Sequence, residues 1–164
     1  MTLREDALQA SYRRLERALY NVLYRQLWQA QDCQDVIHDA FMRVWERRAK
    51  VDEATLDALL WTTALNLARN RLRWRKLRRH VPLEQAEAVP HDAGGGDFLA
   101  TRRLRQALRE LPPASRDVLL LAEFSGLRGA EIAAVLGIPA GTVASRKHHA
   151  MERLKTLLGE SVDA

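Results

Sequence analysis

Residues 129–154, GAEIAAVLGIPAGTVASRKHHAMERL, decide how the C-terminal part of this 164-residue chain folds. The stretch predicts a helix, a tight turn and a second helix with its polar groups on one face. Ala133, Gly137 and Val143 have helix-turn-helix spacing: a small residue at the helix crossing, a glycine free to take positive φ, and a branched residue locking the second helix. Pro139 pre-sets the turn. Because such a unit mainly serves to place its second helix in the major groove, the stretch predicts DNA binding.

The free side of the second predicted helix carries the candidate DNA-binding residues. Thr142 lies where side chains or backbone amides meet a phosphate. Arg146 can hold a phosphate or donate two hydrogen bonds to guanine. The candidate set is Thr142, Ser145, Arg146, His148 and His149. The alternative interpretation is a structural helical hairpin with a polar exposed face.

A second basic segment belongs to a helix predicted from Leu56 to about Arg79. Seven cations fall within eleven residues with no acid between them: Arg69, Arg71, Arg73, Arg75, Lys76, Arg78 and Arg79. Such charges repel each other in a free helix, so we expect an anionic partner to compensate them. Trp74 offers a flat face for stacking on an unpaired base, and Asn66 and Asn70 lie one turn apart upstream. The alternative is a solvated helix end with Trp74 packed on its own lobe.

The remaining pattern predicts an all-α protein made of two small helical domains and a flexible linker. Apolar residues recur at helical spacing over 3–30 and again to about Arg47, with Asp32 expected to cap the second helix. Lys50 to Thr55 is short and polar, with Asp52 or Thr55 as a cap. Further helices are predicted over 98–110 and, from a Ser115 cap, to about residue 125.

Residues 81–97, VPLEQAEAVPHDAGGGD, contain two prolines and three consecutive glycines, which predict a linker. The expected domains are therefore 1–80 and 98–164. Residues 1–80 hold 16 basic and 10 acidic residues, 81–97 hold none and four, and 98–164 hold ten and seven. Two basic lobes joined by an acidic connector suit a protein that meets phosphate at both ends.

Other classes of function find little support in the sequence. Cys33 is the single cysteine, and no Cys/His cluster has zinc spacing, so we expect neither a disulfide nor a metal. No glycine-rich phosphate loop or nucleophile-elbow serine is present, so we expect no catalytic residue and no cofactor. No apolar run has the length of a membrane span and no secretory signal opens the chain, which predicts a cytoplasmic protein with no membrane insertion.

Three segments resemble those of bacterial sigma factors of the extracytoplasmic-function (ECF) type, the minimal two-domain group of the sigma-70 family. DVIHDAFMRVW (35–45) resembles the stretch that binds the clamp helices of the polymerase β′ subunit. LLWTTALNLARNRLRWRK (59–76) resembles the helix that recognises and opens the minus-ten element. Residues 111–154, with the core EIAAVLGIPAGTVASR, resemble the domain that binds the minus-thirty-five element.

The resemblance implies roles that residue physics alone does not assign. Asp35, His38, Asp39 and Arg43 would otherwise be a solvated face of i, i+4 ion pairs, and they become a candidate polymerase-binding face. Lys50 and Asp52 fall where the family captures a flipped non-template base. The residues that would face the melting duplex are Asn66, Arg69, Asn70, Arg73 and Trp74.

The partners implied are core RNA polymerase, through its β′ clamp helices and β flap, promoter DNA, and an anti-sigma protein that covers the polymerase-binding faces. The sequence departs from the family at Leu59, Asn70, Ala144 and His149, so promoter sequence cannot be copied from relatives. Two rival functions predict other sequence features. A response-regulator-like activator should carry period-two strands in residues 1–80, and a helical protein-interaction module has no need for Thr142, Ser145 and Arg146 on one free face.

Overall fold

The computed structural model describes residues 2–78 and 98–159, and every regular element in these two ranges is helical. This confirms the predicted all-α fold class. The chain divides into two compact units, Met1–Pro90 and His91–Ala164. The linker predicted over 81–97 and residue Arg79 lie outside the described residues. No helix within the described ranges is both long and apolar enough to cross a membrane.

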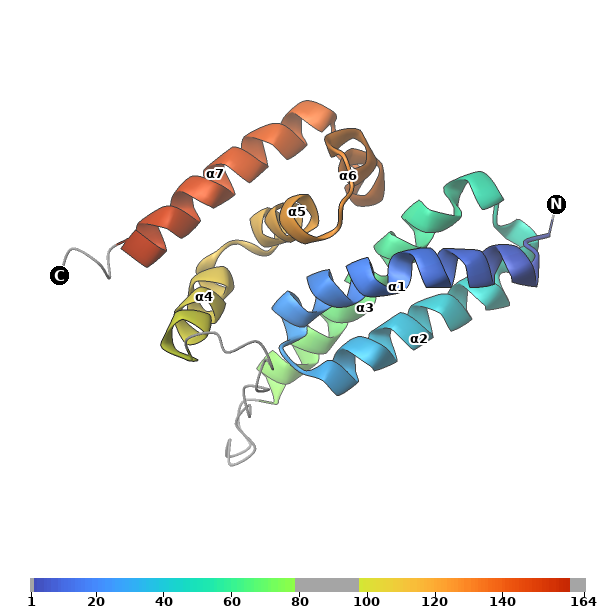
Figure 1. The fold of residues 1–164 in the computed structure, drawn as a ribbon, viewed down its shortest axis with the longest axis horizontal. Helices are drawn as coiled ribbons and strands as arrows, with labels where there is room; N and C mark the ends of the chain where they lie inside the picture. Colours follow the sequence, from blue (N-terminus) through green and yellow to red (C-terminus); the bar gives the residue numbers. More distant parts are fainter. Residues whose placement is uncertain (1, 79–97, 160–164) are drawn as a thin grey trace. The chain divides into compact units, whose positions relative to one another are not determined.

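The N-terminal unit is a bundle of three helices, α1 (Glu5–Leu27), α2 (Ala30–Glu46) and α3 (Leu56–Leu77), each packed against the other two (Figure 1). Their apolar faces follow the predicted helical period. Side chains with at most 2 % of their surface exposed include Leu19, Val22, Leu23, Val36, Val44, Leu60, Trp61 and Ala64. The core of this unit is therefore built by the residues whose spacing predicted the helices.

Helix α2 begins earlier than the sequence predicts, and Asp32 is not its cap. Gln29 has extended backbone angles and precedes the first helical residue, Ala30, so Asp32 lies inside the first turn. There its carboxylate accepts hydrogen bonds from two arginines of α3. An acid in the first turn still faces the positive end of the helix dipole, which retains part of the stabilisation expected of a cap.

Two 3₁₀ turns, Arg48–Lys50 and Glu53–Thr55, connect α2 to α3. The Asp52 carboxylate accepts a hydrogen bond of 3.0 Å from the Ala54 backbone N–H and caps the second turn. Thr55, the other predicted cap, donates its hydroxyl to the Asp52 carbonyl instead. The chain start braces this connection, because the Leu3 N–H donates to the Arg48 carbonyl at 2.9 Å.

The C-terminal unit contains α4 (Phe98–Glu110), α5 (Pro113–Phe124), α6 (Gly129–Leu136) and α7 (Ala140–Gly159). The other three helices of the unit all pack against α7. Buried apolar side chains fill the interior: Leu108, Leu111, Val118, Leu120, Leu121, Ile132, Val143 and Ala150.

Helix α5 begins at Pro113 rather than after the predicted Ser115 cap. A proline at the first helical position has its φ already set and lacks the N–H that would otherwise lose its partner, which explains the earlier start. The backbone N–H of Arg116 donates to the Pro112 carbonyl at 2.9 Å, so the first turn closes on this proline pair.

Candidate nucleic-acid and polymerase-binding surfaces

Helices α6 and α7 form the predicted helix-turn-helix. Gly137 ends α6 with φ 66°, and Ile138 N–H donates to the Ala133 carbonyl at 3.1 Å, so the glycine takes the left-handed conformation that the sequence requires of it. The Thr142 and Val143 N–H groups both bond to the Pro139 carbonyl and start α7.

The two sides of α7 differ as the spacing predicts. Val143 is 3 % and Ala150 2 % exposed, so this side locks α7 into the unit. Ser145, His148 and His149 are exposed, whereas Thr142 and Arg146 are half-buried. The structure therefore brings the five predicted DNA-binding residues onto the part of α7 that the core does not use.

The start of α6 is held by two hydrogen bonds that Arg128 donates to Glu131. Arg128 N–H donates to the Glu131 carboxylate at 2.9 Å, and the Arg128 guanidinium lies 3.1 Å from the same oxygen. The backbone hydrogen bond, followed by the side-chain bond, holds the pKa of Glu131 below its usual value. These two bonds fix where α6, the first helix of the helix-turn-helix, begins.

Helix α3 presents a polar exposed row on successive turns, formed by Asn66, Asn70 and Trp74. Trp74 has 60 % of its surface exposed, which rules out the alternative in which it packs on its own lobe. Arg69 and Arg73 are exposed beside this row. The structure thus brings together all five α3 residues predicted to face melting DNA.

Two cations of α3 have an anionic partner inside the protein, which the sequence does not predict. The sequence suggests that an external anion compensates the whole cluster, but Arg71 and Arg75 both pair with Asp32 of α2. Sequence reasoning missed this internal partner because Arg71 and Arg75 lie 39 and 43 residues from Asp32, and no local pattern links them.

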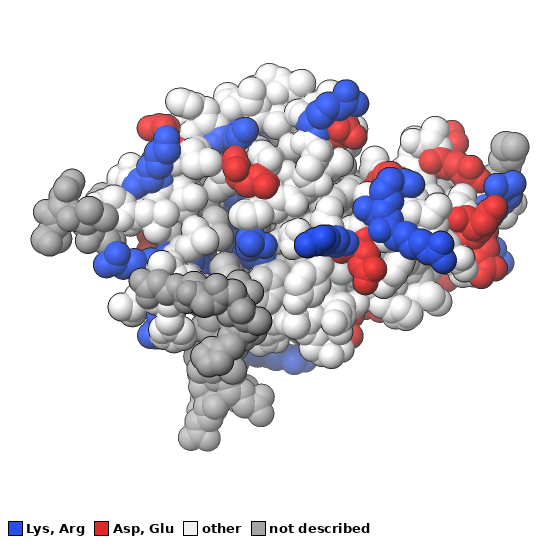
Figure 2. Space-filling model, in the orientation of Figure 1, with Lys and Arg blue, Asp and Glu red and all other residues white. Residues whose placement is uncertain are grey.

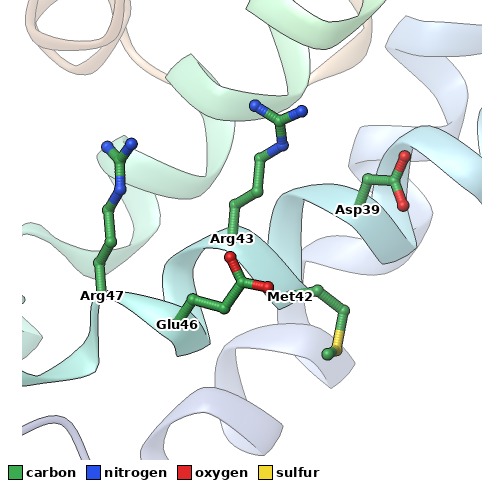
Figure 3. A pocket seen from close by; sticks show the side chains of 5 residues that line it. All are labelled: Asp39, Met42, Arg43, Glu46 and Arg47. Carbon is green, nitrogen blue, oxygen red and sulfur yellow. The ribbon is translucent and has the colours of Figure 1, made fainter.

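Helix α2 carries a shallow hollow of about 380 Å³ lined by Asp39, Met42, Arg43, Glu46 and Arg47. In Figure 3 the side chains of Arg43 and Arg47 extend toward the same side, with Glu46 between them. Two of the four predicted polymerase-binding residues, Asp39 and Arg43, therefore line one hollow. His38 is exposed outside this lining, and Asp35 is half-buried, with its carboxylate 3.8 Å from Arg71.

A second hollow, of about 340 Å³, lies between α1 and α2 and shares Met42 with the first. Its lining is mainly apolar and consists of Glu5, Leu8, Gln9, Phe41, Met42 and Trp45. Phe41 is buried, whereas Leu8 and Trp45 are half-buried, so the apolar faces of α1 and α2 meet the surface at this hollow. Met42 is 44 % exposed and connects the charged and apolar parts of this surface.

The connection between α2 and α3 exposes both predicted base-capture residues. Lys50 ends the first 3₁₀ turn with an exposed side chain, and Asp52 is exposed at the start of the second. One oxygen of the Asp52 carboxylate already accepts the Ala54 N–H. The geometry therefore leaves the remaining oxygen available to another donor.

Charge on the displayed face is mixed, with Lys and Arg interspersed among Asp and Glu (Figure 2).

Within the described ranges no group of three or more His, Cys, Asp or Glu side chains is placed to hold a metal ion. Cys33 is fully buried, and burial raises the pKa of its thiol to about 12.

Two family matches cover most of the described chain: residues 11–79 match Sigma-70 region 2, and residues 101–154 match Sigma-70, region 4. The RNA polymerase sigma-E factor of Streptomyces coelicolor is 32 % identical over 163 residues, which cover 98 % of this chain and 85 % of that protein. The ECF RNA polymerase sigma factor SigL of Mycobacterium tuberculosis is 28 % identical, over 89 % of this chain and 90 % of the relative. The chain is an ECF sigma factor of the sigma-70 family.

A solved structure resembles this sigma factor over nearly its whole length. It is the co-crystal structure of the sigma factor RpoE in complex with the anti-sigma factor NepR from Bartonella quintana. The likeness has a TM-score of 0.70 at 24 % identity and covers 92 % of this sigma factor and 96 % of that chain. It shows that the two share their fold.

Proposed function

We propose that this sigma factor binds core RNA polymerase, directs it to specific promoters and assists promoter melting. The observation that carries the proposal is the match of the two compact units to region 2 and region 4 of the sigma-70 family. We assign residues 1–80 to polymerase and minus-ten binding, 81–97 to a flexible linker, and 98–164 to minus-thirty-five binding.

The α2 hollow is the surface that we assign to the polymerase β′ clamp helices. Asp39 and Arg43 carry opposite charges on its wall, which supports selective recognition of a partner with the complementary pattern. Exposed Met42 and the adjacent apolar hollow add area from which water is displaced on binding. Asp35 and His38 extend the same face of the helix.

Reading of the minus-thirty-five element is assigned to α7. Arg146 supplies the guanidinium that suits guanine or phosphate, and Thr142 lies one turn earlier, at the helix start. Ser145, His148 and His149 are exposed along the same part of the helix and complete the contact set. We assign the β flap of the polymerase as the second protein contact of this unit.

Opening of the minus-ten element is assigned to α3 and the connection before it. Asn66, Asn70 and Trp74 form the exposed row, and Arg69 and Arg73 supply charge beside it. A flipped base loses a few kcal/mol of stacking, so the loop with Lys50 and Asp52 must supply matching contacts. Binding energy drives strand opening, and we propose that the protein has no catalytic activity and needs no cofactor.

We also infer that an anti-sigma protein controls this factor. The related structure is a sigma factor bound to an anti-sigma factor, which supports the inference for a chain of the same fold. Such a partner would cover the α2 hollow and so compete with polymerase. Because the target is bacterial RNA polymerase, the proposed place of action is the cytoplasm.

Run-off transcription tests the proposal. Purified full-length protein is added to core RNA polymerase of a related bacterium on a library of randomised promoter templates. We expect initiation that depends on the added protein and enriches a two-part sequence. Absence of added initiation on every template would overturn the proposal, whereas co-purification with core polymerase, which neither rival function predicts, would count against both rivals.

A further inference from the structure

A cluster of ion pairs ties the C-terminal half of α3 to the rest of the N-terminal unit. Asp32 lies in the first turn of α2 and accepts a hydrogen bond of 2.9 Å from Arg71 Nη1 on one oxygen. Its other oxygen accepts a hydrogen bond from Arg75 Nη2. One carboxylate thus holds two arginines that lie one turn apart on α3.

Arg75 has a second anchor at the end of α1. Its Nη1 donates to the Leu27 carbonyl at 2.7 Å, and its Nη2 lies 3.4 Å from Gln29 Oε1. The Leu27 carbonyl belongs to the last turn of α1, where carbonyls lack a partner within their own helix. A cation is favoured there, so Arg75 links all three helices of the bundle.

This cluster is partly shielded from water. The side chain of Asp32 is 21 % exposed, and those of Arg71 and Arg75 are 34 % and 32 % exposed. Such a pair is screened less by salt than one at full exposure. The carboxylate bridges the two guanidinium groups, one on each oxygen, and charge-assisted hydrogen bonds of this kind are stronger than neutral ones.

Apolar packing holds this part of α3 less firmly, with Leu72 half-buried. The last fully buried side chain of the helix is Ala68, and none of residues 69–77 is buried. The N-terminal half, in contrast, buries Leu56, Leu60 and Trp61. The orientation of the final turns of α3 therefore depends more on the Asp32 cluster than the orientation of the first turns does.

Four of the five proposed melting residues, all except Asn66, lie on these final turns. Arg73 and Trp74 fall between Arg71 and Arg75 in sequence and are exposed, so they project from another side of the helix. We propose that Asp32 is a positioning residue for promoter opening, which holds Arg71 and Arg75 within the protein and so aims Asn70, Arg73 and Trp74 at the duplex. This inference rests on the proposed function and assigns a role to a residue outside the DNA-contacting set.

The test compares Asp32→Asn with Asp57→Asn in the full-length protein with core polymerase. Asp57 is a matched control because its carboxylate also joins α3 to another helix, through Arg14 at 2.7 Å and Ser11 at 2.9 Å. It lies at the opposite end of α3, beside the buried residues Leu56 and Leu60. Promoter opening is measured by permanganate reactivity of the minus-ten thymines on a promoter selected with the wild-type protein.

Two templates separate positioning from general instability. One is fully duplex, and the other carries an unpaired minus-ten segment, on which no melting is needed. We expect Asp32→Asn to lower opening of the duplex by up to about 100-fold, the scale of loss when a group is misplaced by 1 Å. Transcription from the unpaired template and competition for core polymerase should stay near wild type, as should every readout for Asp57→Asn. Asp32→Glu keeps the charge and should recover part of the duplex opening.

Other outcomes overturn the inference. Duplex opening by Asp32→Asn at the wild-type rate removes Asp32 from promoter opening while the proposed function stands. Equal losses on both templates, with loss of core binding, reduce the cluster to a folding role, and an Asp32→Glu protein that opens DNA no better than Asp32→Asn does the same. Tighter promoter binding by Asp32→Asn, together with weaker binding by Arg75→Gln, makes Arg75 a DNA ligand. If the wild-type protein itself does not initiate, the proposed function fails and the inference falls with it.

Discussion

Arg146 is the side chain of α7 best suited to read a base edge or hold a phosphate. Replacement by alanine should weaken promoter binding by a free energy of about 1–3 kcal/mol, because one bidentate contact is lost, and promoter-dependent transcription should fall with it. Binding to core polymerase should not change, since Arg146 belongs to the assigned DNA-contacting set and lies outside the assigned polymerase face on α2. Both quantities can be measured by run-off transcription and by competition for core polymerase.

The matched control is Lys155→Ala, which removes a cation from the same helix. Lys155 lies nine residues further along α7, half a turn out of phase with Arg146, and its ammonium lies 3.6 Å from Glu152. Promoter-dependent transcription should tolerate this change. Similar losses for both variants would show that α7 binds DNA through bulk charge and would contradict the role assigned to Arg146.

Cys33 is a buried thiol with no route to reactivity in the folded protein. Burial is the main reason that its pKa rises to about 12, with the Asp32 charge adding to the rise and Arg75 opposing it. Because the thiolate is the reactive form, iodoacetamide should leave Cys33 unmodified at pH 8 in the native protein and modify it after unfolding in guanidinium. Mass spectrometry measures the extent of reaction. Fast modification of the native protein would contradict the burial of Cys33.

Asp32 shows what single-residue reasoning misses. Asp is a helix-capping residue type, and its place just before an apolar run predicts a cap for α2. The structure places it inside the first turn, bonded to Arg71 and Arg75. Its partners come from a helix 39 or more residues away, so only the packing of the bundle brings them together. Rules based on neighbouring residues identify Asp32 as a capping residue type, but they cannot predict that two distant arginines bind it.

At the scale of single elements, the turn between α6 and α7 depends on Gly137. Its φ of 66° costs a residue with a Cβ atom about 1–2 kcal/mol, although no atom lies within 4 Å of the position that a Cβ would take. Gly137→Ala should therefore lower the free energy of unfolding of the C-terminal unit by about that amount. Chemical denaturation followed by circular dichroism measures the change.

Gly141 supplies the control within the same motif. It lies in the first turn of α7 with no positive φ, and the space that an added methyl group would take is equally open. Gly141→Ala should stabilise the unit by about 0.4–1 kcal/mol, because alanine loses less conformational freedom on folding. If both alanine variants changed stability in the same direction, the left-handed turn would not be the cause.

Helix α2 offers a charge-reversal test of the proposed polymerase face. Asp39→Arg should weaken competition for core polymerase by about tenfold or more, since a like charge then meets a site complementary to a carboxylate. Asp39 is exposed, so the fold should be retained. Gln34→Arg adds a cation to the same helix at an exposed position outside both hollows and should compete normally. Normal competition by Asp39→Arg would remove this residue from the face.

The helices themselves are largely predictable, because each buries a stripe that repeats at the helical period. Val36, Ala40 and Val44 are all buried, as their i, i+4 spacing indicates. Helix starts are less certain, since α5 begins at Pro113 rather than after Ser115. The hollows on α2 are not foreseeable from sequence, because an open hollow depends on how neighbouring helices splay and not on one helix alone. The roles of the predicted site residues stay predictions.

At the scale of the whole molecule, the chain divides into two compact units, and the surfaces that we propose for polymerase and DNA lie on both of them. Basic residues exceed acidic ones in both flanking segments, whereas residues 81–97 hold four acids and no base. If residues 81–97 form the flexible linker that their composition predicts, simultaneous engagement of two promoter elements is costly for the free protein. We propose that core polymerase supplies the fixed spacing.

This division of labour predicts a large difference in affinity between the free and the polymerase-bound protein. Holding both units at the correct spacing makes the second contact intramolecular, which should tighten promoter binding by about 100-fold or more. Fluorescence anisotropy with a labelled promoter measures Kd for the free protein and for the complex with core polymerase, at one fixed salt concentration because phosphate contacts are salt-dependent. A shuffled duplex of the same length corrects for non-specific binding by polymerase.

In the Arg146→Ala protein the gain in promoter affinity should shrink, because one of the two tethered contacts is weakened. Equal affinity of the free and bound wild-type protein would mean that the tether alone sets the spacing, and the polymerase would then serve only to start transcription.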